Sequence, residues 1–534
     1  MTDASTTDAS TTGTPPSVRE ASFALLRALG VTSVFGNPGS TELPMFRDFP
    51  SDFRYVLGLQ ESVALAMADG YAQATHNAAL VNLHSAAGVG HAMGSLFTAY
   101  RNRTPLVVVV GQQARSLLSG EPYLFSDQAA EMPKPYVKWS REPARAEDVP
   151  AAIARAYYVA MAPPKGPVLV SVPADDWDRP AAPVEARRVS TSMGADLDLL
   201  DEVGRALAAA RNPALIVGAA VDQDGAFADV VELAEAHQAR VWAAPMSSRC
   251  SFPERHPLFA GFLPPLHAGI VDQLSGHDVV LVLGAPVFTY HVAGSGPHVP
   301  PDTALYQITD DPQTAAWTPV GTSVLAGVRP AVRHLLGHRP PRPRTPPAPR
   351  PAVPRVGAAD AITQAFLMQT LADVRAPGTV IVEEAPSSRP LMCEHLPNEH
   401  PESFYTCASG ALGHSLPAAV GMALGRPRDR IVAVVGDGSA MYSIQALWSA
   451  AELGLPLTVV VVNNRSYATV DRFAQRFGIE KPVGTALSGL DFVGLARAQR
   501  CRATRVSRPD QLADALREAL ASTGPHLLEV EVDE

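Results

Sequence analysis

Two short polar motifs, each following a run of apolar residues, supply the side chains best suited to chemistry in this sequence. Gly436-Asp437-Gly438 follows the apolar run at 431–435, and Asn463-Asn464 follows a second run that begins at 459. A helix-like stretch at 443–453 separates them, so the unit is predicted to be strand, helix, strand. The carboxyl ends of neighbouring parallel strands form the ligand-binding edge of an open α/β sheet. We therefore expect Asp437 and Asn464 to face one site.

The oxygen atoms of this pair indicate a hard cation with phosphate oxygens in its shell. A carboxylate and a side-chain amide suit an octahedral ion such as Mg²⁺. Gly436 and Gly438 carry no side chain, so backbone amides can approach a diphosphate at the start of the helix. The simpler interpretation, an ordinary Gly-Asp-Gly turn, is disfavoured because two apolar runs and a second polar pair frame the motif.

Together the motifs resemble the diphosphate-binding signature of thiamine diphosphate enzymes, in which Gly-Asp-Gly is followed by Asn-Asn. The resemblance implies thiamine diphosphate and Mg²⁺ as cofactors. It places the metal ligands at Asp437, Asn464 and the backbone carbonyl of Ser466. Further contacts to the cofactor are implied for the following residues: Asn37, Pro38, Gly39, Ser387, Gly410, Leu412, Gly436, Gly438, Ser439 and Tyr467.

Length and composition predict an ordinary globular protein of about three domains. The chain has 534 residues, of which 46% are hydrophobic, and no run approaches the roughly 20 apolar residues that span a bilayer. A net charge of −10 argues against a nucleic-acid surface. The four cysteines stand far apart, which predicts neither disulfides nor a zinc site and favours a reducing cytoplasm.

Alternating apolar runs and helix-like stretches divide the chain into three α/β blocks. Residues 1–16 are expected to be a disordered leader, and 339–356 an extended, solvated linker because eight prolines lie between 339 and 355. The blocks span 17–180, 195–338 and 357–534, and each is predicted to form a doubly wound parallel sheet. Strands are expected at 33–35, 55–59, 79–83, 106–110 and 168–172, then at 214–217, 241–244, 279–283 and 304–308.

The order of the blocks resembles the pyrimidine-binding, central and diphosphate-binding domains of pyruvate-decarboxylase-like thiamine diphosphate enzymes. That resemblance covers essentially the whole chain beyond the leader. The central block has no Gly-x-Gly-x-x-Gly and no clear phosphate loop, so a dinucleotide site there is not supported.

Glu61 lies at the end of the predicted strand at 55–59 and the start of a predicted helix at 62–74. Alone, it would be interpreted as a first-turn glutamate that the helix dipole favours. The resemblance implies more: the family places its indispensable acid here, at a ring nitrogen of the aminopyrimidine. There the carboxylate stabilises the tautomer that removes the C2 proton of the thiazolium.

Two loops narrow the resemblance. Gly36-Asn-Pro-Gly-Ser-Thr-Glu42 follows the first predicted strand, and Asn82-Leu-His-Ser-Ala-Ala-Gly follows the third, so both loops lie at the ligand edge. A histidine also follows Gly284-Ala-Pro-Val-Phe in the central block. This set resembles the benzoylformate decarboxylase group. The matching residues here are Ser40, His84 and His291, with Ser40 binding substrate carboxylate and the histidines transferring protons.

The candidate substrate pocket departs from that group. An aromatic residue usually precedes the cysteine of its Cys-Ala-x-Gly segment, whereas Thr406 precedes Cys407 here. The other predicted pocket residues are Thr469, Val470 and Phe473. The pocket is therefore expected to accept an apolar substituent but to discriminate less strictly for a phenyl ring.

The resemblance implies non-oxidative decarboxylation of an aromatic 2-oxo acid to an aldehyde and CO2, through a thiamine ylide and an enamine. Carboligation is an expected side activity.

One alternative is an acetohydroxyacid-synthase-like or oxalyl-CoA-decarboxylase-like enzyme, which would need a flavin or nucleotide site. Another is a non-catalytic homologue that binds the cofactor. The expected partners are a small 2-oxo acid and further copies of the chain, as a homodimer or homotetramer with the active site between chains, and no nucleic acid or membrane.

Overall fold

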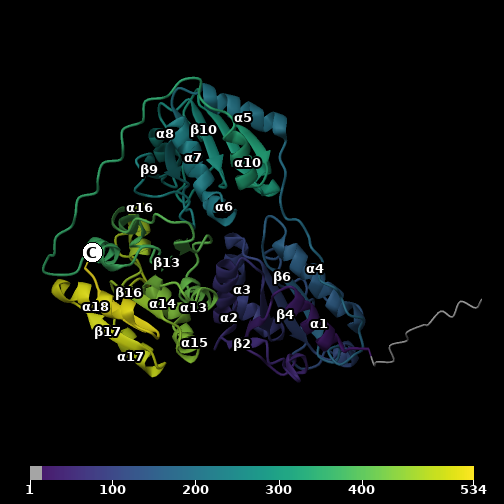
Figure 1. Ribbon diagram of the computed structural model, residues 1–534. Helices are drawn as coiled ribbons and strands as arrows, with labels where there is room; N and C mark the ends of the chain where they lie inside the picture. The colour runs from purple at the N-terminus through teal and green to yellow at the C-terminus, as the bar shows by residue number, and fades with distance from the viewer. Residues whose placement is uncertain (1–14, 534) are drawn as a thin grey trace, which may run out of the picture.

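The computed structural model describes residues 15–533, which form three domains of alternating strands and helices (Figure 1). Each domain contains one six-stranded sheet with parallel strand pairs throughout. The central domain lies at the top of Figure 1, with the first domain at lower right and the third at lower left. This confirms the predicted fold class of three doubly wound parallel sheets. The predicted leader at 1–16 lies outside the described residues except for its last two.

The first sheet has the strand order β2-β1-β3-β4-β6-β5. Its elements are α1 (Val18–Ala28), β1 (Ser33–Gly36), η1 (Leu43–Phe46), β2 (Arg54–Leu57), α2 (Glu61–Thr75), β3 (Ala79–Leu83), α3 (Ser85–Asn102), β4 (Leu106–Gln112), η2 (Arg115–Gly120), β5 (Ser140–Arg141), η3 (Ala146–Asp148), α4 (Val149–Met161) and β6 (Val168–Pro173). Strands β3, β4 and β6 are buried along their whole length because helices cover both faces, which explains their continuous apolar sequences.

The central sheet has the order β12-β11-β10-β7-β8-β9, which is also the strand order of dinucleotide-binding folds. Its elements are α5 (Leu197–Ala209), β7 (Pro213–Val217), α6 (Ala219–Gln223), α7 (Phe227–His237), β8 (Arg240–Ala243), β9 (Phe259–Phe262), α8 (His267–Gln273), β10 (Val279–Leu283), β11 (Ala304–Thr309), α9 (Pro312–Trp317), β12 (Thr322–Leu325) and α10 (Val328–Leu335).

The third sheet, β14-β13-β15-β16-β18-β17, repeats the strand order of the first sheet. Its elements are α11 (Gln364–Val374), β13 (Val380–Glu384), α12 (Arg389–His395), β14 (Phe404–Thr406), α13 (Ser415–Gly425), β15 (Ile431–Gly436), α14 (Asp437–Ser443), α15 (Ala446–Glu452), β16 (Leu457–Asn463), α16 (Ala468–Arg476), α17 (Phe492–Ala498), β17 (Arg502–Val506), α18 (Pro509–Ala521) and β18 (His526–Glu531). The predicted domain boundaries fall between the three sheets and stay predictions.

The helix after Gly436 differs from the prediction. We expected one helix at 443–453, but α14 begins at Asp437 and a second helix, α15, begins at Ala446. Gly438 and Ser439 therefore belong to a helical first turn rather than to a loop. The prediction was wrong because glycine disfavours helix interiors, whereas a first turn tolerates it.

The proline-rich linker at 339–356 contains no helix or strand, as predicted, but it is not solvated throughout. The guanidinium group of Arg344 donates hydrogen bonds to the carbonyl oxygens of Leu207 and Ala208 at 2.8 Å and of Ala210 and His237 at 2.9 Å. These carbonyls lie at the ends of α5 and α7, where backbone acceptors lack partners within the helix. Arg344 thus fastens the linker to the central domain.

The first and third domains pack through α2 and α13, which lie side by side near the middle of Figure 1. A Cβ atom on Gly70 would collide with the carbonyl of Ala418, and one on Gly421 with that of Met67. Beside this crossing, Nε2 of His414 lies 3.0 Å from Oδ2 of Asp69, and both residues are buried. Burial alone would raise the pKa of Asp69, but its pairing with His414 holds that pKa below the usual range.

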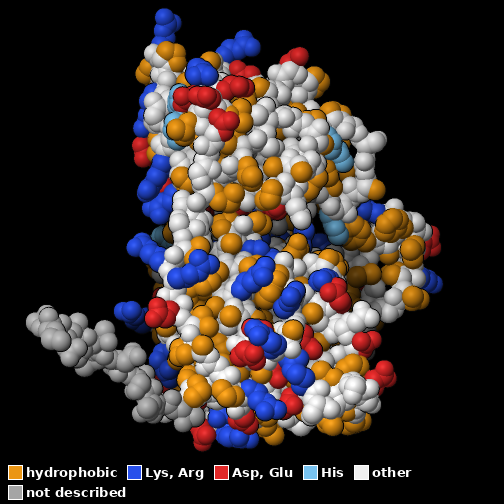
Figure 2. Space-filling view, turned by 90° about the vertical axis from the view of Figure 1, so that its right-hand side faces the viewer, with side chains coloured by type: hydrophobic (Ala, Val, Ile, Leu, Met, Phe, Trp, Pro, Cys, Tyr) orange, Lys and Arg blue, Asp and Glu red, His pale blue; other side chains and the backbone are white. Residues whose placement is uncertain are grey.

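None of the helices in the described residues is long and apolar enough to cross a membrane. On the face drawn in Figure 2, Lys and Arg side chains are interspersed with Asp and Glu side chains.

Candidate active site

Two of the predicted loops meet at the switch point of the first sheet. Strands β1 and β3 are adjacent and parallel, but the chain leaves β1 toward one side and reaches β3 on the other. The loop Asn37, Pro38, Gly39 and Ser40 follows β1, and His84 follows β3 as the N-cap of α3. A Cβ atom on Gly39 would collide with the imidazole ring of His84. Glycine is therefore needed at position 39 for these loops to meet.

His84 is held by two residues that the sequence analysis did not single out. Its Nδ1 lies 2.9 Å from Oε2 of Glu42 and 3.1 Å from Oγ1 of Thr41. Glu42 is only 1% exposed and also accepts a hydrogen bond from the backbone N–H of Gly39 at 2.7 Å. Because the carboxylate accepts from Nδ1, the Nε2 of a neutral His84 remains free to accept a proton.

Glu61 is the first residue of α2 and is 8% exposed. Its Oε2 lies 3.0 Å from Nδ1 of His91 on α3, a partner that the sequence did not reveal. The side chain of His91 is 61% exposed. A Cβ atom on Gly88 would lie 3.4 Å from Oε1 of Glu61, so α3 packs closely over this carboxylate. Because α2 begins at Glu61, the helix start predicted at residue 62 is one residue late.

Asp437 and Asn464 lie at the ends of adjacent parallel strands, as predicted, since β15 pairs with β16. Asp437 is 3% exposed, and burial raises the pKa of its carboxyl group although the backbone N–H groups of Gly438, Arg465 and Ser466 counter this effect. Its Oδ2 atom is buried without a hydrogen-bond partner. A buried, unsatisfied carboxylate oxygen beside the 464–466 turn fits a cation ligand.

The turn after β16 is organised by its own polar groups. The backbone N–H of Ser466 donates to Oδ1 of Asn464 at 3.2 Å, and the Ser466 hydroxyl donates to Asp471 at 2.6 Å. A Cβ atom on Gly438 would collide with the ring of Tyr467, whereas one on Gly436 would have no atom within 3.4 Å. The predicted close approach of a diphosphate therefore has room at Gly436, while Gly438 makes room for Tyr467.

The remaining cofactor candidates surround the start of α13. Oxygen atoms of Glu384, at the end of β13, accept hydrogen bonds from the backbone N–H groups of Gly413, His414 and Ser415. Burial raises the pKa of the Glu384 carboxyl group. The candidates Gly410, which has a φ of +72°, and Leu412 lie in the loop just before this helix, and the carbonyl of Ser387 accepts a hydrogen bond from Arg472 at 2.8 Å.

His291 and Phe473 come together from two domains. Their ring centroids are 4.8 Å apart and the rings are nearly perpendicular. His291 follows the central strand β10, and Phe473 lies on α16 with Thr469 and Val470. The hydroxyl of Thr469 is buried without a partner, and Val470 is 51% exposed. Thr406 ends the edge strand β14 and is partly buried.

The predicted residues thus form two groups within the chain. Ser40, Glu61 and His84 lie in the first domain, while His291, Phe473, Asp437 and Asn464 lie in the central and third domains. In the described part of the chain, no hydrogen bond or ion pair joins Ser40, Glu61 or His84 to the second group. Apolar side chains beside both groups are exposed, among them Leu43 at 60% and Tyr442 at 58%.

Comparison with known proteins finds three matching domain families. The N-terminal thiamine pyrophosphate binding domain matches residues 16–132, the central domain of thiamine pyrophosphate enzymes 200–335, and the C-terminal thiamine pyrophosphate binding domain 387–530.

Full-length relatives match as well. The chain is 42% identical to benzoylformate decarboxylase of Pseudomonas aeruginosa, over 96% of this chain and 98% of that protein. The structure of the thiamine diphosphate-dependent 4-hydroxybenzoylformate decarboxylase of Rhodococcus jostii matches with a TM-score of 0.94 at 42% identity, covering 97% and 99% of the two chains. That of benzoylformate decarboxylase from Polynucleobacter necessarius matches with a TM-score of 0.95 at 41% identity, covering 97% and 98%.

Proposed function

The chain belongs to the thiamine pyrophosphate enzymes, and on that premise we propose that it decarboxylates an aromatic 2-oxo acid such as benzoylformate, releasing an aldehyde and CO2 without oxidation. The observation that carries the proposal is the 42% identity to benzoylformate decarboxylase over nearly the full length of both chains. Carboligation of a second aldehyde is the side activity that this chemistry predicts.

We propose Mg²⁺ as the metal, held by Asp437, Asn464 and the backbone carbonyl of Ser466. The buried, unpaired Oδ2 of Asp437 supports this assignment. The first turn of α14, from Gly436 to Ser439, would bind the diphosphate through backbone N–H groups. The other cofactor contacts would come from Asn37, Pro38, Gly39, Ser387, Gly410, Leu412 and Tyr467. Bound thiamine diphosphate supplies the carbon nucleophile and accepts the electron pair that the departing CO2 leaves behind.

The side chains of the protein would bind the substrate and move protons. Ser40 would donate a hydrogen bond to the substrate carboxylate. His84, with Nδ1 held by Glu42, would take up or release a proton at Nε2, and His291 would do so from the central domain. Glu61 would hold a proton between its carboxylate and the aminopyrimidine ring. Thr406, Thr469, Val470 and Phe473 would line the pocket for the substituent of the 2-oxo acid.

The active site is proposed to lie between two chains, in a homodimer or a homotetramer. The separation of the predicted residues into two groups supports this, because a partner chain could bring the Glu61 group of one protomer to the Asp437 group of the other. The exposed Leu43 and Tyr442 lie beside the two groups and would be covered in such an interface.

The alternatives are less well supported. A cavity of about 170 Å³ lies between the first and central domains, lined in part by Arg103, Lys165 and Asp310. It is smaller than the roughly 300–1,000 Å³ of common cofactor sites, so it does not favour an acetohydroxyacid-synthase-like or oxalyl-CoA-decarboxylase-like enzyme. A non-catalytic homologue would be expected to lack Glu61 or a metal ligand, and the chain has them all.

We also propose a cytoplasmic enzyme, since all four cysteines are free thiols.

Activity should be tested with purified protein, thiamine diphosphate, Mg²⁺ and benzoylformate, by following benzaldehyde and CO2. Asp437→Ala serves as the matched variant and should lose both cofactor affinity and turnover. Absence of CO2 release from every aromatic 2-oxo acid by wild-type protein with bound cofactor would refute the proposed function.

A further inference from the structure

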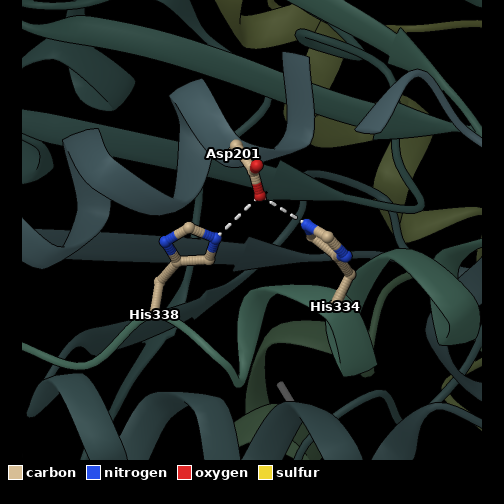
Figure 3. Close-up of side chains that lie close together, drawn as sticks. All are labelled: Asp201, His334 and His338. Atoms are coloured by element: carbon tan, nitrogen blue, oxygen red, sulfur yellow. Dashed lines mark hydrogen bonds and ion pairs between the residues drawn. The ribbon is translucent and has the colours of Figure 1, made fainter. Parts of the chain in front are cut away.

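Three potential metal ligands converge on the surface of the central domain, outside the candidate active site. Asp201 lies on α5, His334 on α10, and His338 just beyond the end of α10 (Figure 3). Oδ1 of Asp201 lies 2.7 Å from Nε2 of His334 and 3.0 Å from Nε2 of His338. The three donor atoms lie within 4.8 Å of one another, and no other such group of three occurs among residues 15–533.

The spacing of these atoms suits a transition-metal ion. Zinc bonds of about 2.0–2.1 Å in a tetrahedron require ligand atoms roughly 3.3 Å apart, so the two measured separations of 2.7 and 3.0 Å would widen by about 0.6 and about 0.3 Å. The side chains of Asp201, His334 and His338 are 40%, 31% and 23% exposed, so an ion and a coordinating water could enter directly from solvent.

Gly204 provides an independent sign that the position of the His338 ring matters. This glycine is buried in the middle of α5, one turn after Asp201, where an alanine would favour the helix more. A Cβ atom on Gly204 would collide with the ring of His338. The glycine therefore allows the imidazole to lie flat against α5, beside Asp201.

The basic side chains next to the two histidines in the sequence form ion pairs with other acidic residues. The guanidinium groups closest in sequence to the histidines have other acidic partners: Arg333 lies 3.1 Å from Asp229, and Arg339 lies 3.0 Å from Glu232. No arginine or lysine among the described residues forms an ion pair with Asp201. Its carboxylate is therefore available to a cation.

We propose that Asp201, His334 and His338 form a binding site for a divalent transition-metal ion of the Zn²⁺ class, with water as a fourth ligand. Two imidazole nitrogens and one carboxylate oxygen favour Zn²⁺, Co²⁺, Ni²⁺ or Cu²⁺ over Mg²⁺ and Ca²⁺. Both Nε2 atoms bind the ion only without a proton, so metal binding releases the protons that they carry.

A bound ion would crosslink the first helix of the central domain to the residue that precedes the proline-rich linker. His338 is followed at once by the linker, and Arg344 fastens the same linker to the end of α5 six residues later. The ion would thus fix the point at which the chain leaves the central domain toward the third domain. The site is structural in this proposal and does not depend on the proposed function.

The experiment is a Co²⁺ titration of untagged holoenzyme in excess thiamine diphosphate and Mg²⁺, followed by the visible absorption of tetrahedral Co²⁺ and repeated with Zn²⁺ as competitor. Wild-type protein should bind one Co²⁺ per chain more than the double variant His334→Ala/His338→Ala, and Zn²⁺ should displace it. His256→Ala is the matched control, because Glu235 is the one acidic partner of His256 among the described residues. It should keep the extra ion.

Two milder variants test the same site in case the double variant does not fold. Asp201→Asn keeps an acceptor for the histidine N–H groups but removes the charge, and it should weaken Co²⁺ binding at least about tenfold. Gly204→Ala should displace the His338 ring and weaken binding similarly. Equal Co²⁺ stoichiometry in wild type and the double variant, or unchanged affinity in Asp201→Asn, would overturn the proposal.

Discussion

Oε2 of Glu42 lies 2.9 Å from Nδ1 of His84, and the same carboxylate receives the backbone N–H of Gly39 at 2.7 Å. One buried acid therefore fixes both the imidazole and the loop that carries Ser40. A histidine held in this way by a carboxylate keeps one tautomer and one ring orientation, which leaves Nε2 available for proton transfer. The pairing makes Glu42 a positioning residue for the proposed reaction.

Glu42→Gln should lower kcat about tenfold or more while changing KM less, because an amide can present its N–H₂ to Nδ1 and favour the wrong tautomer. Steady-state kinetics with benzoylformate provide the measurement. Glu235→Gln is the control, since Glu235 pairs with His256 at 3.2 Å on the surface and should leave kcat unchanged. A normal kcat in Glu42→Gln would show that His84 does not need this carboxylate.

Glu61→Gln should slow hydrogen exchange at C2 of bound thiamine diphosphate by about two decades, in line with loss of one acid–base contact. Cofactor affinity should change far less. Exchange can be followed by NMR after acid quenching. His91→Ala removes the 3.0 Å partner of Glu61 but leaves the carboxylate in place, so its exchange should stay much closer to wild type. Unchanged exchange in Glu61→Gln would show that Glu61 does not promote proton removal at C2 and serves only as a first-turn helix residue.

Co-expression of Glu61→Gln and Asp437→Ala chains should restore activity that neither variant has alone. In a hybrid dimer with shared sites, one site receives both altered residues and the other receives neither. A hybrid dimer therefore has about one half of the wild-type number of intact sites. Hybrids purified through two different tags provide the measurement. Activity no greater than the sum of the two parents would place the whole site within one chain.

Features set by local sequence were predictable. The strand ends that carry Asp437 and Asn464 could be located because an apolar run and its polar ending lie next to each other in the chain. Glu42 stood within a recognised motif, yet its partner His84 is 42 residues away. Arg344 reaches Leu207 across 137 residues. Such contacts depend on how elements pack, and no periodicity in the sequence reports them.

Acid should destabilise the protein through His237, which is fully buried at the end of α7 beside Arg344. Burial, with the charge of Arg344, lowers the pKa of His237 from 6.5 to about 4. Between these two values the unfolded chain binds the proton and the folded chain does not, so stability falls as the pH drops through this window. The loss attributable to His237 is about 3 kcal/mol.

Urea unfolding of wild type and His237→Gln from pH 7 to pH 4 provides the measurement. Carboxylates titrate in both proteins, so the difference between the two curves isolates the histidine. The free energy of unfolding of the variant should fall less steeply with acid. Parallel curves would mean that His237 has a similar pKa in the folded and unfolded chains.

Substrate choice should respond to Thr406, which ends strand β14 on the same face as Phe404. A threonine here offers no ring to pack against a phenyl substituent, and one such apolar contact accounts for about 1–3 kcal/mol of discrimination. Wild-type protein should therefore decarboxylate benzoylformate but discriminate poorly against aliphatic 2-oxo acids. Thr406→Phe should raise the ratio of kcat/KM for benzoylformate over an aliphatic acid, and Thr406→Val, which adds no ring, is the control. Two results would show that Thr406 does not line the substrate pocket. One is strict benzoylformate selectivity in the wild type; the other is an equal kcat/KM ratio of benzoylformate to the aliphatic acid in Thr406→Phe and Thr406→Val.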